Sequence, residues 1–256
     1  METLTISQHT IFIPLMLTTI AGLATVVGSL VFFLIKNFKN SYLVFCLGLS
    51  AGAMLYVSFV ELLTSAITNI GFIPANLGFI TGIIFMMAID FIIPHKHMSE
   101  KDGINTEHKD LYPTGILLAT GIAIHNFPEG MAVFISSLSD PHLGTALAIA
   151  IAAHNIPEGI AIAMPIYYST RSKGKAFLYS FFSGIAEPLG AILMIVWLGN
   201  SVTSTTVDYL FAFVAGIMVF ICFDELLPQA FKKDYHRIAI SGILTGMLIM
   251  IASLSI

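Results

Sequence analysis

Charged side chains are scarce in this 256-residue chain, where Asp, Glu, Lys and Arg together make up only 10% of the residues. A soluble domain needs a larger share of charge to cover its surface, whereas 57% of the residues here are hydrophobic. The composition therefore excludes an ordinary soluble domain. The chain also has no cluster of Lys and Arg of the kind that marks a nucleic-acid-binding face. Its length has to be counted in membrane spans of about 20 apolar residues each.

Cysteine is scarce as well. Cys46 and Cys222 both fall inside apolar stretches, so we interpret them as small core residues and find no support for a disulfide or a thiolate metal site. Residues 1–10 contain no Lys or Arg, in contrast to a cleavable signal peptide. We therefore expect the first apolar stretch to remain in the protein as a span.

Eight apolar stretches follow one another with short connectors. The predicted fold class is all-α: a polytopic membrane bundle of eight transmembrane helices with inverted repeats, formed by a single transmembrane domain over residues 1–256. The longest connector is a polar, cytoplasmic loop at 94–112. The predicted spans are residues 10–35, 42–66, 72–93, 113–138, 143–168, 174–199, 206–228 and 237–255.

The positive charges predict the orientation of these spans. All eleven Lys and Arg residues lie at the connectors that follow the first, third, fifth and seventh spans. The termini and the other three connectors have none. Because cytoplasmic loops carry the excess of Lys and Arg, we predict a multi-pass protein of the cytoplasmic membrane with both termini on the extracytoplasmic side. An error of one span would break the alternation, which supports the count of eight.

Two internal repeats relate the spans to one another. Residues 121–133 (GIAIHNFPEGMAV) in the fourth span resemble residues 150–162 (AIAAHNIPEGIAI) in the fifth. Residues 51–63 (AGAMLYVSFVELL) in the second span match residues 215–227 (AGIMVFICFDELL) in the seventh at seven of 13 positions. Both pairs join spans that run in opposite directions. Inverted repeats of this kind are typical of secondary transporters, whose substrate sites lie near the membrane midplane at the repeat interface.

Ionisable side chains inside spans are costly and mark functional sites. His125 and Glu129 are four residues apart in the fourth span, and His154 and Glu158 have the same spacing in the fifth. Residues at this spacing share a helix face. Glu187 in the sixth span falls at a similar depth. One buried His would be an ordinary hydrogen-bonded core residue, but two copies of the pattern with a third carboxylate predict a metal site.

Imidazole and carboxylate ligands suit Zn²⁺, Fe²⁺, Mn²⁺ or Co²⁺, and the lack of thiolate argues against Cu⁺. Asn126 and Asn155 add carbonyl oxygens, and Glu129 and Glu158 are placed to bridge two adjacent ions. Each motif also contains a proline that leaves a helix carbonyl without its usual partner. We expect these breaks to direct oxygen atoms towards the site; the prolines are Pro128, Pro157 and Pro188.

Other acidic residues fall nearer the ends of spans, where they can reach water. Glu61, Asp90 and Glu225 are candidates for an access and release path between the buried site and water, and the alternative is that each simply reaches water at its own helix end. Two GxxxG pairs, Gly48/Gly52 and Gly242/Gly246, allow close helix contact either inside the bundle or between subunits.

The motifs HNFPEG (125–130) and HNIPEG (154–159) resemble the paired motifs of the ZIP (Zrt-, Irt-like) metal transporters. SGIAEPLG (183–190) and FDELLP (223–228) add to the resemblance, which covers the whole chain, and the short loop is similar to that of the bacterial ZupT-type branch. The resemblance implies a binuclear site, uptake into the cytoplasm and a homodimer. It assigns one metal to His125, Glu129, His154, Glu158 and Glu187, and the second to Asn126, Asn155 and the same three glutamates.

The functional hypothesis is thus a secondary transporter of divalent transition-metal ions, with Zn²⁺ first and Fe²⁺, Mn²⁺ and Co²⁺ as further cargo. We expect the metal to be cargo, with no cofactor. The alternative is an intramembrane metal-dependent enzyme. The chain has His-Asn-x-Pro-Glu where metalloproteases have His-Glu-x-x-His, and its spacing also differs from the Glu-x-x-His of di-iron carboxylate proteins. Both enzyme classes are therefore less well supported than transport.

Overall fold

The computed structural model describes residues 3–4, 8–35, 39–92, 111–198, 202–231 and 235–255. Almost all of these residues are helical, which confirms the predicted all-α class. Besides short turns between helices, the described residues include a two-stranded pairing of β1 (Thr3–Leu4) with β2 (Val202–Thr203). The helices are α1 (Gln8–Leu34), α2 (Asn40–Tyr56), α3 (Leu63–Ile70), α4 (Phe72–Ile92), α5 (Leu111–Ser139), α6 (Pro141–Thr170), α7 (Lys173–Gly184), α8 (Ala186–Leu198), α9 (Ser204–Ile221), α10 (Leu227–Ala230) and α11 (His236–Leu254), with π-helical turns η1 (Val57–Leu62) and η3 (Cys222–Leu226).

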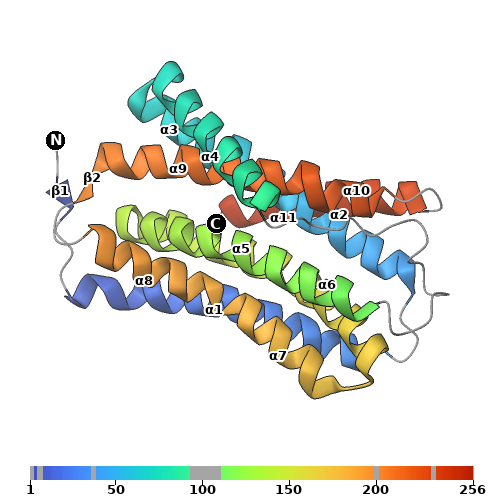
Figure 1. Cartoon of the computed structure of the whole chain (residues 1–256). Helices are drawn as coiled ribbons and strands as arrows, with labels where there is room; N and C mark the ends of the chain where they lie inside the picture. Colours follow the sequence, from blue (N-terminus) through green and yellow to red (C-terminus); the bar gives the residue numbers. More distant parts are fainter. Residues whose placement is uncertain are drawn as a thin grey trace.

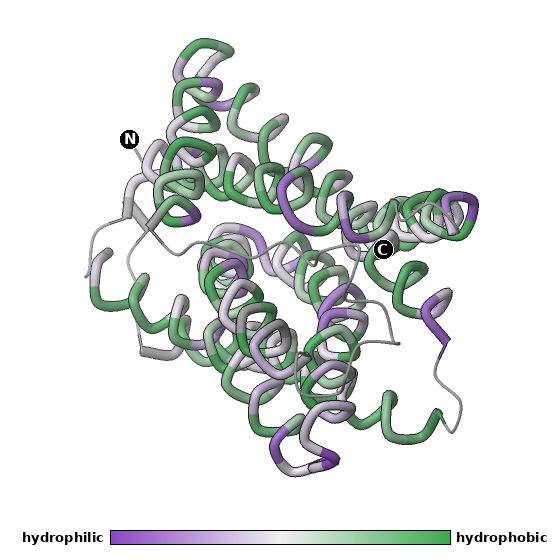
Figure 2. Tube along the Cα trace, turned by 45° about the vertical axis from the view of Figure 1, so that its right-hand side comes forward, coloured by the Kyte–Doolittle hydropathy of each residue, from purple (hydrophilic) through white to green (hydrophobic). Residues whose placement is uncertain are grey.

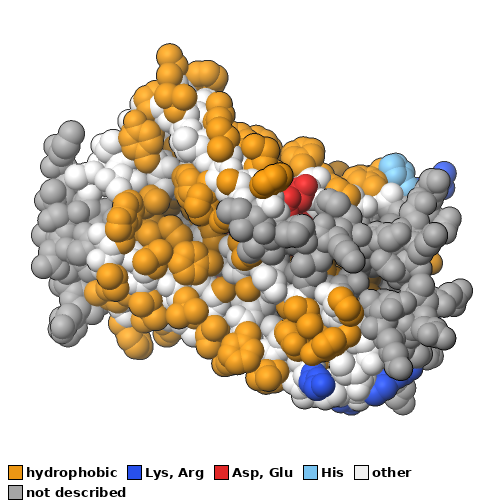
Figure 3. All heavy atoms as spheres, viewed as in Figure 1, with side chains coloured by type: hydrophobic (Ala, Val, Ile, Leu, Met, Phe, Trp, Pro, Cys, Tyr) orange, Lys and Arg blue, Asp and Glu red, His pale blue; other side chains and the backbone are white. Residues whose placement is uncertain are grey.

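In the described residues, seven helical segments are long and apolar enough to cross a membrane. They include the continuous segments α2–η1–α3 and α9–η3–α10. The segment α5, 29 residues long, is packed among them. Most of the helical trace is hydrophobic (Figure 2), and apolar side chains cover much of the face drawn in Figure 3, as a lipid-facing bundle requires. The protein is therefore a multi-pass membrane protein.

The α5 and α6 helices lie side by side in the middle of the bundle (Figure 1). On one side, α1 packs along α6 and α8 packs along α5. On the other side, α2 packs along α11 and α4 packs along α9. These contacts agree with an inverted repeat in which the first span is equivalent to the sixth, the second to the seventh, the third to the eighth, and the fourth to the fifth. Under this equivalence, the contact of α1 with α6 corresponds to that of α8 with α5, and the contact of α2 with α11 corresponds to that of α9 with α4.

Small residues make these packings close. A Cβ atom at Gly52 would overlap the carbonyl oxygen of Ile243, and one at Gly246 would overlap that of Leu49. The two GxxxG pairs thus join α2 to α11 within one chain, so they allow close helix contact inside the bundle and not between subunits.

Local sequence explains several helix boundaries. Asp140 caps α6, because its carboxylate accepts hydrogen bonds from the backbone N–H groups of His142 (2.8 Å) and Leu143 (3.4 Å). The helix ends at Arg171, which has a left-handed backbone (φ 54°). Ser172 then caps α7 by accepting from the N–H of Lys175 (3.3 Å). This short turn holds α6 and α7 next to each other.

The prolines have different effects in different helices. The α5 and α6 helices continue through Pro128 and Pro157. The predicted sixth span instead divides at Ile185 into α7 and α8, three residues before Pro188. Because a proline lacks the N–H that a continuing helix would use, α8 begins afresh at Ala186 and places Glu187 in its first turn.

Two π-helical turns occupy corresponding places in the second repeat. Adding the repeat offset to η1 (57–62) gives residues 221–226, and η3 spans Cys222–Leu226. The side chain of Thr64 bonds the carbonyl of Phe59, five residues earlier, at 2.7 Å. Since π-helical turns are rare and often occur at functional sites, their recurrence at equivalent positions supports a structural repeat.

Candidate metal centre

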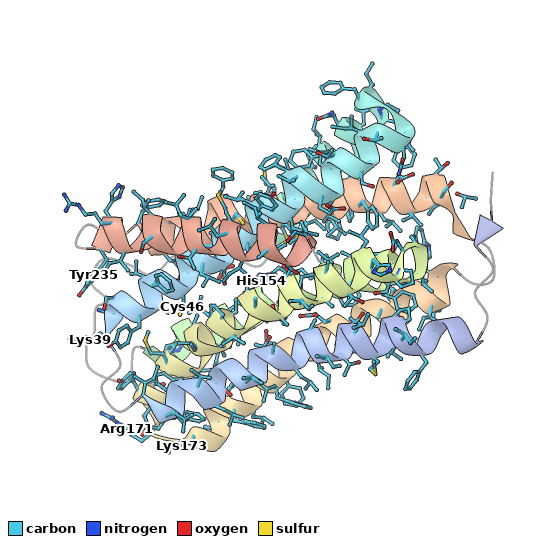
Figure 4. All side chains as sticks on the ribbon, turned by 180° about the vertical axis from the view of Figure 1, so that it is seen from behind. Lys39, Cys46, His154, Arg171, Lys173 and Tyr235 are labelled. Atoms are coloured by element: carbon cyan, nitrogen blue, oxygen red, sulfur yellow. The ribbon has the colours of Figure 1, made fainter. Side chains whose placement is uncertain are left out.

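The two copies of the histidine motif face each other across the α5–α6 boundary. His125 and Glu129 lie on α5, His154 and Glu158 lie on α6, and all four side chains are at most 1% exposed. His154 Nε2 lies 3.0 Å from Glu129 Oε2, and His125 Nε2 lies 3.2 Å from Glu158 Oε1. Each histidine therefore pairs with the glutamate of the other copy. Figure 4 shows His154 well inside the bundle, away from the labelled charged residues at its end.

The two asparagines are held by their amide nitrogens. Asn126 Nδ2 donates to the carbonyl of Ser183 at 3.2 Å, and Asn155 Nδ2 donates to the carbonyl of Ala21 at 2.8 Å. The same nitrogen of Asn155 also donates to Glu187 Oε1. Both asparagine side chains are fully buried. Their Oδ1 atoms have no hydrogen-bond partner and remain available to a ligand.

The third carboxylate, Glu187, reaches the site from α8. It is fully buried and lies in the first turn of its helix, where the helix dipole favours a negative charge. A Cβ atom at Gly130 of α5 would overlap the Glu187 carbonyl oxygen. The absence of a side chain at Gly130 thus lets the backbone of α8 approach α5 directly beside Glu129, and it fixes where Glu187 enters the site.

Buried polar atoms without partners are concentrated here. Such atoms are costly unless something satisfies them. The site's unpartnered atoms are His125 Nδ1 and Nε2, Asn126 Oδ1, Glu129 Oε1, Asn155 Oδ1, Glu158 Oε1 and Oε2, and Glu187 Oε2. His125 Nε2 and Glu158 Oε1 are within ion-pair distance of each other but are not aligned as a hydrogen bond. Nitrogen and carboxylate or amide oxygen are the ligands that divalent transition metals accept.

The side chains do not form a closed coordination shell as they stand. Among the residues that the structure describes, no three His, Cys, Asp or Glu side chains form a group that could hold a metal ion. The imidazoles instead lie against the carboxylates in two pairs. The seven residues that the sequence singled out thus share one buried region, but ligand binding would have to open the two His–Glu pairs.

The candidate path residues are all half-buried. Glu61 lies in η1, Asp90 near the end of α4, and Glu225 in η3. Glu225 is close enough to His125 to interact with it electrostatically.

Cys222 is the residue whose surroundings the sequence did not predict. We assigned it to packing, and it is indeed fully buried. However, its thiol also interacts electrostatically with the carboxylates of Glu129 and Glu158. One signal was present in the sequence, because Cys222 precedes Glu225 by three residues and so lies one helical turn from it.

Comparison with known proteins agrees with this geometry. A family profile described as ZIP zinc transporter matches residues 93–253. A protein of Akkermansia muciniphila named zinc transporter ZupT is 45% identical, with 96% of this chain and 97% of that protein covered. Proteins of the same name from Streptococcus mutans (46% identical, 97% and 98% covered) and Chlorobium limicola (47%, 95% and 97%) are equally similar. With its paired motifs facing each other in the middle of a membrane bundle, the chain belongs to the ZIP zinc transporter family.

Proposed function

We propose that this protein transports Zn²⁺, and with it Fe²⁺, Mn²⁺ and Co²⁺, across the bacterial cytoplasmic membrane and into the cytoplasm. The observation that carries the proposal is the set of fully buried, unpartnered nitrogen and oxygen atoms contributed by α5, α6 and α8. A divalent cation would satisfy these atoms and offset the charge of three carboxylates. Membership of the ZIP family and the names of the relatives support the same activity.

The arrangement suggests how a cation would be held. The Oδ1 atoms of Asn126 and Asn155 have no hydrogen-bond partner, whereas the carboxylates of Glu129 and Glu158 are paired with histidines. A cation would take the place of the imidazole as the partner of each carboxylate, and the freed imidazole nitrogens would become ligands. Carboxylates have two oxygens and can bridge, so two adjacent ions are feasible.

The reverse exchange would release the ion. When the cation leaves, the His–Glu pairs can form again and keep the carboxylates from repelling one another in a low-dielectric environment. Because each pair takes one residue from α5 and one from α6, binding at either pair involves both helices. A site that is stable both with and without its cargo is suited to repeated loading and unloading.

The comparisons do not support the enzyme alternative. The matching proteins are named as transporters. A catalytic zinc also keeps an open position for water with a general base beside it. Here the carboxylates of Glu129 and Glu158 are engaged by histidines.

The orientation is part of the proposal. Lys39, Arg171 and Lys173 lie at one end of the bundle (Figure 4), and the Lys173 ammonium lies 5.6 Å from the ring centre of Phe33, near the end of α1. Tyr235, which precedes α11, is at the same end. If cations face the cytoplasm, then α1 ends there, α11 begins there, and both termini are extracytoplasmic. We add a homodimer in the membrane, on the family resemblance alone.

Uptake of metal into vesicles distinguishes a transporter from an intramembrane metal-dependent enzyme. The purified protein would be reconstituted into sealed vesicles, and accumulation of radioactive Zn²⁺ would be measured with and without excess Fe²⁺, Mn²⁺ or Co²⁺. We expect time-dependent accumulation that these ions reduce and that an ionophore releases. Vesicles with correctly folded protein that take up no more Zn²⁺ than empty vesicles would contradict the proposal.

A further inference from the structure

The two π-helical turns bring a matched pair of polar side chains into the apolar interior. The 164-residue offset between the repeats relates Ser58 to Cys222, just as it relates Glu61 to Glu225. Both Ser58 and Cys222 are fully buried. Neither belongs to α5, α6 or α8, so they approach the centre of the bundle from a different side than the predicted metal ligands.

Several contacts place the Cys222 thiol beside the metal centre. Its Sγ lies 3.8 Å from the carbonyl oxygen of Ala51 on α2. The neighbouring residue Ser50 donates a hydrogen bond of 3.1 Å to the carbonyl of His154, so this part of α2 touches the helix that carries the second motif. The thiol also interacts electrostatically with the Glu129 and Glu158 carboxylates. It therefore lies against the part of α2 that contacts α6, on the α9–η3 side of the bundle.

Unpartnered polar atoms point to a ligand in this region. Glu129 Oε1 and Glu158 Oε2 are buried without partners. They belong to the two carboxylates that interact electrostatically with Cys222. The hydroxyl of Ser58, the counterpart of Cys222, is also buried without a partner. Other helical hydroxyls in this protein bond the carbonyl four residues earlier, as Thr18 and Ser137 do. Ser58 does not, and neither do the buried hydroxyls of Thr25, Ser136 and Ser183.

We propose that Cys222 is a specificity-determining residue, whose thiol lines the cation path beside Glu129 and Glu158 and offers a soft sulfur ligand there. The inference rests on the proposed transport function. Sulfur ligands favour soft cations over hard ones, and carboxylates do the opposite. A thiol next to a carboxylate-rich site therefore raises the affinity for thiophilic ions such as Cd²⁺ relative to Mn²⁺.

The test compares Cys222→Ser and Cys222→Ala with Cys46→Ser. Cys46 is the matched control, because it is half-buried on α2 and lies nearer the Lys39 end of the bundle than His154 does (Figure 4). For each variant, the concentrations of Cd²⁺ and Mn²⁺ that halve Zn²⁺ uptake into vesicles are measured. We expect both Cys222 variants to need about tenfold more Cd²⁺, with little change for Mn²⁺. The Cys46 variant should match wild type in both.

A second measurement is independent of uptake rates. In the Cys46→Ser protein, whose only remaining thiol is Cys222, a small mercurial reagent should label the thiol more slowly when Zn²⁺ is present. If the ratio of Cd²⁺ to Mn²⁺ inhibition is unchanged in the Cys222 variants, or if uptake of all ions falls together, the thiol has no part in selection and the inference is wrong. The wild-type protein, measured in vesicles prepared in the same way, is the control that shows that the vesicles support transport.

Discussion

His154 Nε2 on α6 lies 3.0 Å from Glu129 Oε2 on α5, and the equivalent atoms of His125 and Glu158 lie 3.2 Å apart. Each pair thus combines one residue from either copy of the repeated motif. A histidine and a glutamate four residues apart on one helix share a face, but here neither pairs with its own helix neighbour. The two helices are consequently joined at the site, and a change in one motif copy alters both pairs.

The close approach of α8 to α5 can be tested without touching any ligand. Gly130→Ala places a Cβ atom on the Glu187 carbonyl oxygen and should displace the Glu187 carboxylate from the site. Zn²⁺ uptake should fall by about tenfold or more, as happens when residues that orient a metal ligand are changed. Gly174→Ala is the control, because a Cβ atom there has only an ordinary contact with Ser172. Equal uptake by both variants, at equal expression, would show that this approach does not position Glu187.

Protons should compete with metal for the carboxylates. Protonation of Glu129, Glu158 or Glu187 removes a negative ligand, so the affinity for Zn²⁺ should decrease as the pH falls and increase as it rises through the acidic range. Each proton displaced by the metal corresponds to about a tenfold change in apparent affinity per pH unit. Calorimetry in buffers of different ionisation enthalpy would count these protons. An affinity that stays constant with pH would argue against a site made of carboxylates.

The path residues should differ in the kinetic step that they affect. In the orientation that we propose, the repeat symmetry would put Glu61 towards the outer mouth, and Glu225 and Asp90 towards the inner one. Glu61→Gln should mainly reduce uptake at limiting external metal. Glu225→Gln, alone or with Asp90→Asn, should mainly reduce the maximal rate, because release suffers. Initial rates over a range of Zn²⁺ concentrations would distinguish these effects; if all three variants behave as wild type, these carboxylates have no role in the path.

The orientation predicts where the C-terminus lies. A fluorescent protein that matures only in the cytoplasm, fused after Ile256, should stay dark, while a periplasmic enzyme reporter at the same place should be active. A fusion within the connector between α6 and α7, at Ser172, should give the opposite pattern, because we propose that this charged turn faces the cytoplasm. Bright cells from the C-terminal fusion would reverse the proposed topology.

Much of the helical frame could be predicted from the sequence. The apolar stretches and the alternation of positive charges depend on properties that each residue has by itself, so they predicted helices close to α1, α4, α5, α6 and α11. Pro188 signalled a break in the sixth span, but the break lies at Ile185, because the carbonyl that a proline leaves unbonded belongs to an earlier residue. The predicted loop at 94–112 lies outside the described residues except for its last two, which already belong to α5.

Other features depend on packing between helices and could not be predicted. No residue in VSFVEL marks a π-helical turn, and only the comparison of η1 with η3 shows that both repeats contain one. Spacing in the sequence brought His125 and Glu129 onto one face, but it contains no information about which residue of α6 lies opposite. The approach of Cys222 to the carboxylates likewise depends on how α9 and η3 pack against α2 and α5.

The most direct test of the account is Zn²⁺ uptake by Glu158→Ala and His154→Ala in sealed vesicles, beside wild type and with protein amount and folding matched. Glu158→Ala removes a fully buried carboxylate that we propose as a bridge between two ions, and it leaves His125 without its partner. His154→Ala leaves carboxylate and amide oxygens in place and should reduce uptake less, with a shift in metal preference. We predict a loss of about a hundredfold or more for Glu158→Ala. Wild-type uptake by Glu158→Ala would contradict the assignment of the metal centre.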